Sequence, residues 1–193
     1  MVNSSFWKGR NVAITGHTGF KGSWLSLWLL ELDTEVSGFA LKPETNPSLF
    51  DKLGLSNGIN HRYGDIRDYP SLLEWLQSVR PEVIFHLAAQ PLVRRSYKEP
   101  LLTWETNVIG TINLMEAVRE LSIPCSLVVV TSDKVYENSD LPFSYRETDQ
   151  LGGYDPYSSS KSAAELAVAS WRSSFFNKKS SVRIATARAG NVI

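Results

Sequence analysis

Two short segments of this 193-residue chain bring together side chains that can transfer protons. The first holds a hydroxyl, a carboxyl and an amine side by side in Ser132, Asp133 and Lys134, directly after an apolar run. The second holds Tyr157 and Lys161, which share one face of a helix because they are four residues apart. A phenol has a pKa of about 10, but a neighbouring ammonium favours the phenolate. This pair therefore predicts proton removal from an alcohol that loses hydride.

Both segments also have simpler explanations. The YxxxK spacing occurs on exposed amphipathic helices, and Asp133-Lys134 suits a solvated ion pair in a loop at a strand end. A glycine-rich loop earlier in the chain, together with the Ser132 hydroxyl, favours the catalytic interpretation.

That loop has the sequence GHTGFKG, with glycines at positions 16, 19 and 22. Glycines between a strand and a helix allow a tight turn, a close approach of backbone to a pyrophosphate, and close helix packing. The N–H groups of the first helical turn then face the anion. The spacing is GxxGxxG rather than GxGxxG, and a turn that binds nothing is the alternative. We predict a dinucleotide site.

The second predicted strand has no acidic residue at its end to hold the adenosine ribose. It runs instead to Lys42, which either favours a 2′-phosphate or is a solvated lysine. The choice between NAD and NADP is open at this point.

Apolar β-rich runs alternate with helical periods along the whole chain, without an internal repeat. Asp155 and Pro156 suit the start of the helix that carries Tyr157. Strands that are apolar throughout imply helices on both faces of a parallel sheet. The sequence therefore predicts an α/β fold, a doubly wound, mostly parallel Rossmann-type sheet. The predicted strands are 11–15, 35–40, 62–66, 83–87, 127–131 and 182–187, and the predicted helices are 21–32, 69–79, 103–121 and 156–176.

Composition excludes several classes of protein. Twenty basic residues balance twenty acidic ones, so no net field recruits nucleic acid or an anionic membrane. No apolar stretch is long enough to span a bilayer, and Cys125 alone cannot form an internal disulfide. We expect a cytoplasmic protein that binds a small molecule, with no metal, and with Cys125 as a buried small hydrophobe.

The chain stops directly after its last predicted strand, where ligands bind in such folds. We therefore expect residues 1–193 to be one dinucleotide-binding domain, the N-terminal part of a longer two-domain protein whose substrate domain is largely absent.

Taken together, these motifs resemble the extended short-chain dehydrogenase/reductase superfamily over essentially the whole chain. The matching segments are GHTGFKG, GDIRD at 64–68, HLAA at 86–89, TNVIG at 106–110, TSD, YxxxK and RAGN at 188–191. The resemblance implies NAD as cofactor, Asp65 and Ile66 at the adenine, Asn107 supporting the site, and Lys161 on the nicotinamide ribose. The cofactor residues that it implies are Gly16, His17, Gly19, Phe20, Lys21, Gly22, Asp65, Ile66, Leu87, Ala88, Ala89, Asn107, Tyr157 and Lys161.

Within this superfamily the chain is similar to nucleotide-diphosphate-sugar 4,6-dehydratases. Asp133-Lys134 replaces the Asp-Glu of the dTDP-glucose branch and, with AAQPLVRRSY at 88–97, looks more like the CDP-glucose branch. The resemblance implies that Ser132, Tyr157 and Lys161 serve hydride transfer, while Asp133 as acid and Lys134 as base eliminate water. A lysine base must be neutral for part of the cycle, which burial makes possible.

The resemblance also implies contacts to a sugar nucleotide by Gln90, Arg95, Ser132 and Asn191. Arg94 and Arg95 would meet its diphosphate, or else they are surface arginines on a loop. Dimers or tetramers would form through the helices 103–121 and 156–176, and the pathway would supply deoxysugars for surface polysaccharide. An epimerase or decarboxylase of the same superfamily, and a dinucleotide-binding module without turnover, are the alternatives.

Overall fold

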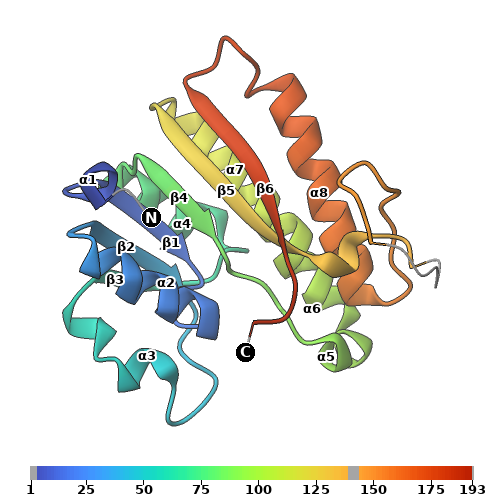
Figure 1. Ribbon diagram of the computed structural model, residues 1–193, viewed down its shortest axis with the longest axis horizontal. Coiled ribbons are helices and arrows are strands. Elements are labelled where there is room, and N and C mark those ends of the chain that lie inside the picture. The colour runs from blue at the N-terminus through green and yellow to red at the C-terminus, as the bar shows by residue number, and fades with distance from the viewer. Residues whose placement is uncertain (1–3, 139–143, 193) are drawn as a thin grey trace.

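The computed structural model describes residues 4–138 and 144–192. Six parallel strands form one sheet in the order β3-β2-β1-β4-β5-β6 (Figure 1). This order confirms the predicted doubly wound Rossmann-type sheet. Successive strands are added outward on one side from β1 to β3 and on the other side from β4 to β6, and such sheets bind ligands at the switch point between β1 and β4. The strands are β1 Asn11–Thr15, β2 Glu35–Ala40, β3 Asn60–Tyr63, β4 Val83–His86, β5 Cys125–Ser132 and β6 Val182–Ala189.

Helices connect these strands, and α8 lies beside β5 and β6 in Figure 1. The α-helices are α1 Ser4–Trp7, α2 Phe20–Glu31, α3 Leu49–Lys52, α4 Tyr69–Val79, α5 Val93–Lys98, α6 Pro100–Trp104, α7 Gly110–Leu121 and α8 Pro156–Ser174. The helix predicted over 103–121 is in fact α6, a π-helical segment η2 Glu105–Ile109, and α7. Two 3₁₀ segments, η1 Leu55–Asn57 and η3 Asp133–Val135, complete the described elements.

Alternate residues of the central strands enter two separate cores, one on each face of the sheet. On one face Val12 and Ile14 pack with Leu29 of α2 and Phe50 of α3. On the other face Ala13, Phe39 and Ile84 pack with α4, α7 and α8, through side chains that include Leu72, Trp75, Leu114, Met115 and Val168. Cys125 is buried in this second core, as predicted, and burial raises the pKa of its thiol to about 12.

Two strands differ from their predictions. Pairing with β2 places β3 at Asn60–Tyr63 rather than at 62–66, because Gly64 and Asp65 already belong to the turn that follows. Strand β6 alternates between buried and exposed residues instead of being apolar throughout, and Arg183, Ala185 and Ala187 are exposed. Among the described residues, helices therefore cover both faces of the central strands but only one face of β6.

Helix α8 begins where the sequence predicts. The Asp155 carboxylate accepts hydrogen bonds from the N–H groups of Tyr157 and Ser158, and Ser158 reciprocates in a capping box. Pro156 occupies the first turn, where its missing N–H costs nothing. This cap fixes the first turn of α8, and with it the phenol of Tyr157.

Candidate active site

The glycine loop is closed by backbone packing between β1 and α2. Gly16 has φ +80°, and its N–H donates to the carbonyl of Phe39 at 2.9 Å. A Cβ on Gly16 would lie 2.6 Å from the backbone nitrogen of Ala88, and a Cβ on Gly22 would overlap the carbonyl oxygen of Gly16. Helix α2 begins at Gly19 without a side-chain cap. The loop is therefore a cradle of backbone N–H groups, which fits the pyrophosphate of a dinucleotide.

His17 points into the protein from this loop. Its ring is fully buried against Phe50 at 5.2 Å and His61 at 5.6 Å, and neither ring nitrogen has a hydrogen-bond partner. Burial, and then the neighbouring His61, lower the pKa of His17 to about 4. The imidazole is thus neutral at pH 7. In contrast, the side chains of Phe20 and Lys21 are exposed.

The predicted adenine residues follow β3. Arg67 holds the carboxylate of Asp65 through its backbone N–H at 2.9 Å and its Nη2 at 2.6 Å. Burial opposes ionisation of this carboxyl, but the bonds from Arg67 outweigh burial and lower its pKa. Ile66 is buried beneath Gly110. At the end of β2, Lys42 lies over the ring of Tyr63, 5.9 Å from its centroid.

A hydrogen-bonded loop follows β4 at the carboxyl edge of the sheet. Asn107, in the π-helical segment, accepts from the N–H of Gln90 at 2.9 Å and donates to its carbonyl at 3.2 Å. The same amide donates to Ser160 of α8 at 2.9 Å, which joins this loop to the tyrosine–lysine helix. The side-chain amide of Gln90 is itself bonded to Leu92 and Thr103. Leu87, Ala88 and Ala89, which precede Gln90 in the chain, are half-buried, and the N–H groups of Leu87 and Ala88 donate to Thr15.

His86 is a residue that sequence reasoning assigned only to a motif. It lies at the end of β4, with Nδ1 2.6 Å from Thr15 Oγ1 and Nε2 3.0 Å from Thr111 Oγ1. Burial, and then the charge of Lys161, lower its pKa to about 3. It is therefore a neutral link between β1, β4 and α7. A lone histidine at the end of an apolar strand was the only signal for it.

Tyr157 and Lys161 lie on the face of α8 that packs against β5, and both are buried, as is Ser132. The Lys161 ammonium donates to the carbonyl of Val130 at 3.4 Å. Burial and the charge of Lys21 lower the pKa of Lys161 to about 8, while Glu165 acts in the opposite direction. The ammonium form still dominates at pH 7, as a phenolate partner requires.

The second acid–base pair follows immediately. Ser132 donates to Asp133 Oδ1 at 3.1 Å, and Lys134 Nζ lies 3.3 Å from the same oxygen. Because Ser132 pairs with Ala189 across β5 and β6, Asn191 comes close enough for its Oδ1 to lie 3.5 Å from Lys134 Nζ. The side chains of Asp133 and Lys134 are 55% and 40% exposed. Both side chains are thus open to solvent among the described residues, and a neutral lysine at this position would need burial that these residues do not supply.

Arg95, on α5, is already paired with carboxylates. Its guanidinium donates to Glu44 and to Glu99, each at 2.8 Å. Contact with a substrate phosphate would require at least one of these exposed bonds to open, so its substrate role stays a prediction.

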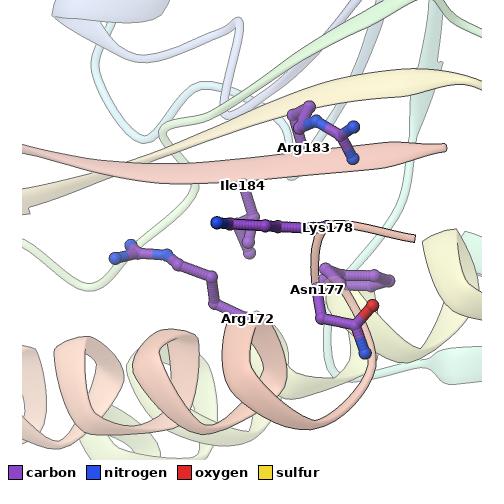
Figure 2. A pocket seen from close by; sticks show the side chains of 6 residues that line it. Arg172, Asn177, Lys178, Arg183 and Ile184 are labelled. Carbon is purple, nitrogen blue, oxygen red and sulfur yellow. The ribbon is translucent and has the colours of Figure 1, made fainter. Parts of the chain in front are cut away.

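Two hollows on the surface of the described residues lie away from this chemistry. One, of about 410 Å³, is lined by Arg172, Asn177, Lys178 and Arg183 near the amino end of β6 (Figure 2). The other is lined by the amino ends of β1, β2 and β3. The acid–base groups, by contrast, gather at the carboxyl ends of the strands, which is where ligands of such sheets bind.

The family model for GDP-mannose 4,6 dehydratase matches residues 13–187, which include the glycine loop and both acid–base segments. The chain belongs to this family. Its curated relatives include the CDP-glucose 4,6-dehydratase of Salmonella typhimurium, which is 48% identical over 100% of this chain and 55% of that protein. A GDP-mannose 4,6-dehydratase of Sordaria araneosa is 32% identical over 86% of the chain and 30% of its own length.

Family membership agrees with the solved structures that are similar. The UDP-glucose 4-epimerase of Thermus thermophilus, solved with NAD, superposes with a TM-score of 0.79 and 26% identity, over 92% of this chain and 54% of that one. The chain thus spans about half the length of the Salmonella dehydratase and of the Thermus epimerase, and 30% of the Sordaria protein. No described helix is long and apolar enough to cross a membrane.

Proposed function

We propose that this chain supplies the cofactor-binding and acid–base half of an NAD-dependent nucleotide-sugar 4,6-dehydratase, with CDP-glucose as substrate. One observation carries the proposal: the exposed pair Asp133-Lys134 directly follows Ser132, at the strand end on which Lys161 packs. A dehydratase needs such a second acid and base, whereas simple hydride transfer does not. The 48% identity to a CDP-glucose 4,6-dehydratase supports the choice of substrate.

The residues at the carboxyl edge of the sheet are of the kinds that would hold NAD. Gly16, Gly19 and Gly22 would admit its pyrophosphate, Asp65 and Ile66 would flank the adenine, and Lys161 would hold the nicotinamide ribose. The bound cofactor would supply a hydride acceptor for the substrate C4 and a hydride donor for C6. No net oxidation of the sugar results.

The buried residues would perform the first stage. Tyr157 takes the proton of the sugar 4-hydroxyl, assisted by the positive charge of Lys161 on the same helix face. Ser132 hydrogen-bonds the same oxygen and fixes the hydroxyl next to the phenol. The product of this stage is a 4-ketone, which acidifies the hydrogen at C5.

The exposed pair would perform the second stage. Lys134, in its neutral form, takes the C5 proton, and Asp133, in its protonated form, gives a proton to the departing 6-hydroxyl. The C6–O bond breaks as the C5=C6 double bond forms, and water leaves. After the hydride returns to C6, Lys134 gives its proton back to C5, which yields the 4-keto-6-deoxy sugar.

The function is tested by incubating this chain, and the chain extended to the length of its relatives, with NAD and either CDP-glucose or dTDP-glucose. We expect the ultraviolet signature of a 4-keto product from CDP-glucose in the extended form. Activity of the extended form with neither sugar nucleotide would defeat the dehydratase proposal.

Two variants test the roles of the exposed pair. Asp133→Asn should retain hydride abstraction from C4 and lose dehydration, and full product formation would exclude its role as acid. Lys134→Met should lose exchange of the C5 hydrogen with solvent deuterium. Unchanged exchange would show that another group is the base.

An epimerase is the second candidate, because the similar solved structures include the UDP-glucose 4-epimerase of Thermus thermophilus. An epimerase needs Tyr157 and Lys161 but not Asp133 or Lys134. Epimerisation of a sugar nucleotide that survives Asp133→Asn would therefore favour it.

We also propose a homo-oligomer that pairs through α7 and α8. Ile109 and Leu166, on η2 and α8, are exposed apolar side chains that such pairing would cover. Light scattering should then show a dimer or tetramer, and Leu166→Glu should shift it toward the monomer. A cytoplasmic location and a role in polysaccharide supply stay predictions.

A further inference from the structure

A buried carboxylate lies one helical turn beyond Lys161 and takes no part in the steps above. Glu165 is 6% exposed, and it accepts hydrogen bonds from Thr131 at 2.5 Å and from Thr186 at 3.0 Å. Arg188 adds two more, from Nε and Nη2, each at 3.2 Å. A buried charge needs such partners, and this one draws them from β5 and β6 at once.

Helix α8 reaches the same strand through neighbouring residues. Lys161 donates to the carbonyl of Val130, and Glu165 accepts from the hydroxyl of Thr131, the next residue along β5. Ser162 donates to the carbonyl of Val135 at 2.7 Å. The helix is thus bonded to β5 and η3 on both sides of the segment 132–134.

Arg188 extends the contact to the segment after η3. Its Nη1 donates to the hydroxyl of Tyr136 at 2.9 Å and to the carbonyl of Glu147 at 3.1 Å. Its guanidinium also lies 4.9 Å from the centroid of the Tyr136 ring. Glu165 and Arg188 therefore connect α8 and β6 to β5, which precedes Asp133 and Lys134, and to the segment that follows η3.

We infer that Glu165 is a positioning residue, which with Arg188 fixes α8 against the Ser132 segment and is the counter-charge of the Lys161 ammonium. The expected effect of Glu165 on catalysis rests on the proposed function, whereas its contacts do not. Glu165 touches no reacting atom in the proposed steps, so it acts through Lys161 and Thr131.

The charges around Lys161 support this role. Lys21 from α2 disfavours its ammonium, His86 of β4 is neutral, and Glu165 of α8 favours the ammonium. Arg188 of β6 is bonded to the Glu165 carboxylate. Burial and Lys21 have already brought the pKa of Lys161 down to about 8. Removing the carboxylate should lower it further, toward neutral pH, where Lys161 would lose charge.

The decisive experiment measures the Lys161 pKa in this chain by NMR of ¹³C-labelled lysine side chains, with Lys161→Met to assign the signal. Glu165→Gln should lower that pKa by at least about half a unit. Thr186→Val is the matched control, because it removes one hydrogen bond to the same carboxylate and leaves every charge in place. It should leave the Lys161 pKa unchanged.

An unchanged pKa in a folded Glu165→Gln chain would overturn the inference, as would an equal fall in Thr186→Val. If Glu165→Gln does not fold, the double variant Glu165→Gln/Arg188→Met is compared with Arg188→Met, so that the two chains differ in the carboxylate alone. The Lys161 pKa should be lower in the double variant, and equal values would again overturn the inference.

This measurement needs neither substrate nor turnover, so it stands even if the dehydratase proposal fails. In an active extended form, Glu165→Gln should reduce kcat more than it changes KM. The limb of the pH profile on which activity is lost as pH rises should move to lower pH, following Lys161.

Discussion

The two sides of the candidate site, the glycine loop and the α8–β5 contact, are built by different means. On the glycine side, Gly16 and Gly22 bring backbone against backbone, and His17 is buried with neither ring nitrogen bonded. On the catalytic side, the buried polar groups of α8 and β5 are bonded to one another, as Glu165, Ser162 and Lys161 show.

The difference teaches which changes each side tolerates. Close packing has no room for an added carbon, but it loses little when a polar group is removed. A bonded network has the opposite sensitivity, because each deletion leaves a buried partner unsatisfied. The glycine side should therefore fail when atoms are added, and the catalytic side when they are removed.

The largest effect should follow a deletion on the catalytic side. Tyr157→Phe removes one oxygen, and because that oxygen is the proposed proton acceptor, turnover should fall by about 10²- to 10⁴-fold. NAD binding, measured by calorimetry, should be retained, since the ring and the capped helix remain. Steady-state product formation in the extended form measures the first effect.

Tyr154→Phe is its matched control. Tyr154 is 82% exposed in the segment before α8, so the same deletion there should leave turnover unchanged. Equal losses of turnover in the two variants would mean that the hydroxyl of Tyr157 is not the proton acceptor. The catalytic side would then not be sensitive to the deletion of this one oxygen.

The fold could be predicted from the sequence because its signals are local. Each central strand is an apolar run, each long helix has its period, and Asp155-Pro156 marks the start of α8. The doubly wound class was predicted, whereas the order of the strands was not; right-handed parallel connections limit that order without fixing it. The π-helical segment at Asn107 was not predicted, since its cause is the tertiary contact of Asn107 with Gln90 and Ser160.

The sequence predicted which residues form the candidate site, but not the hydrogen bonds that these residues make. Tyr157 and Lys161 follow from helical spacing, but the partners of Glu165 come from two strands, β5 and β6, that only the fold brings to α8. The pairing of Arg95 with Glu44 likewise joins residues 51 positions apart. Exposure is also a property of the fold: the sequence indicated only that burial would make a neutral Lys134 possible, and the side chain is 40% exposed in this chain.

The next largest effect should follow an addition on the glycine side. The Cβ of Gly22→Ala would overlap the Gly16 carbonyl and lie 2.8 Å from the Cα of His17, both of them backbone. We expect a loss of about 3 kcal/mol in unfolding free energy, by analogy with overpacked cores. Denaturant titration measures it, and NAD affinity should fall with it.

Gly19→Ala tests whether crowding is the cause. Its Cβ would meet only the Gly16 carbonyl oxygen, at 3.4 Å, and its φ of −78° suits alanine. The unfolding free energy should be nearly unchanged, while NAD binding weakens because the methyl group faces the pyrophosphate cradle. A large loss of stability in this variant would show that the loop is sensitive to more than steric overlap.

A smaller effect concerns pH. Because the pKa of His17 falls from 6.5 to about 4 on folding, the unfolded chain binds more protons below pH 6.5. Stability is therefore complete above that pH and is lost as pH falls from 6.5 toward 4. Between pH 7 and pH 5, His17 should account for a loss of about 2 kcal/mol.

His17→Phe should remove this part of the acid sensitivity. Neither ring nitrogen of His17 is bonded, so the phenyl ring forfeits no hydrogen bond against Phe50. Chemical denaturation at pH 7 and pH 5 should show a shallower pH dependence in the variant, with His86 still contributing. An identical slope in the two proteins would mean that His17 does not stay neutral when buried.

The smallest effect should come from a single deletion in the bonded network. Ser162→Ala removes hydrogen bonds to the carbonyls of Val135 and Ser158, and should cost about 1 kcal/mol in unfolding free energy. The loss stays small because the Val135 carbonyl keeps the N–H of Gly152, while Lys161 still bonds β5. Ser173→Ala, on the exposed end of the same helix, is the control and should have no measurable effect. If Ser162→Ala instead unfolds the chain, the contacts of α8 with β5 form and break as one cooperative unit. The contribution of any one of these contacts to the unfolding free energy could then not be separated from the rest.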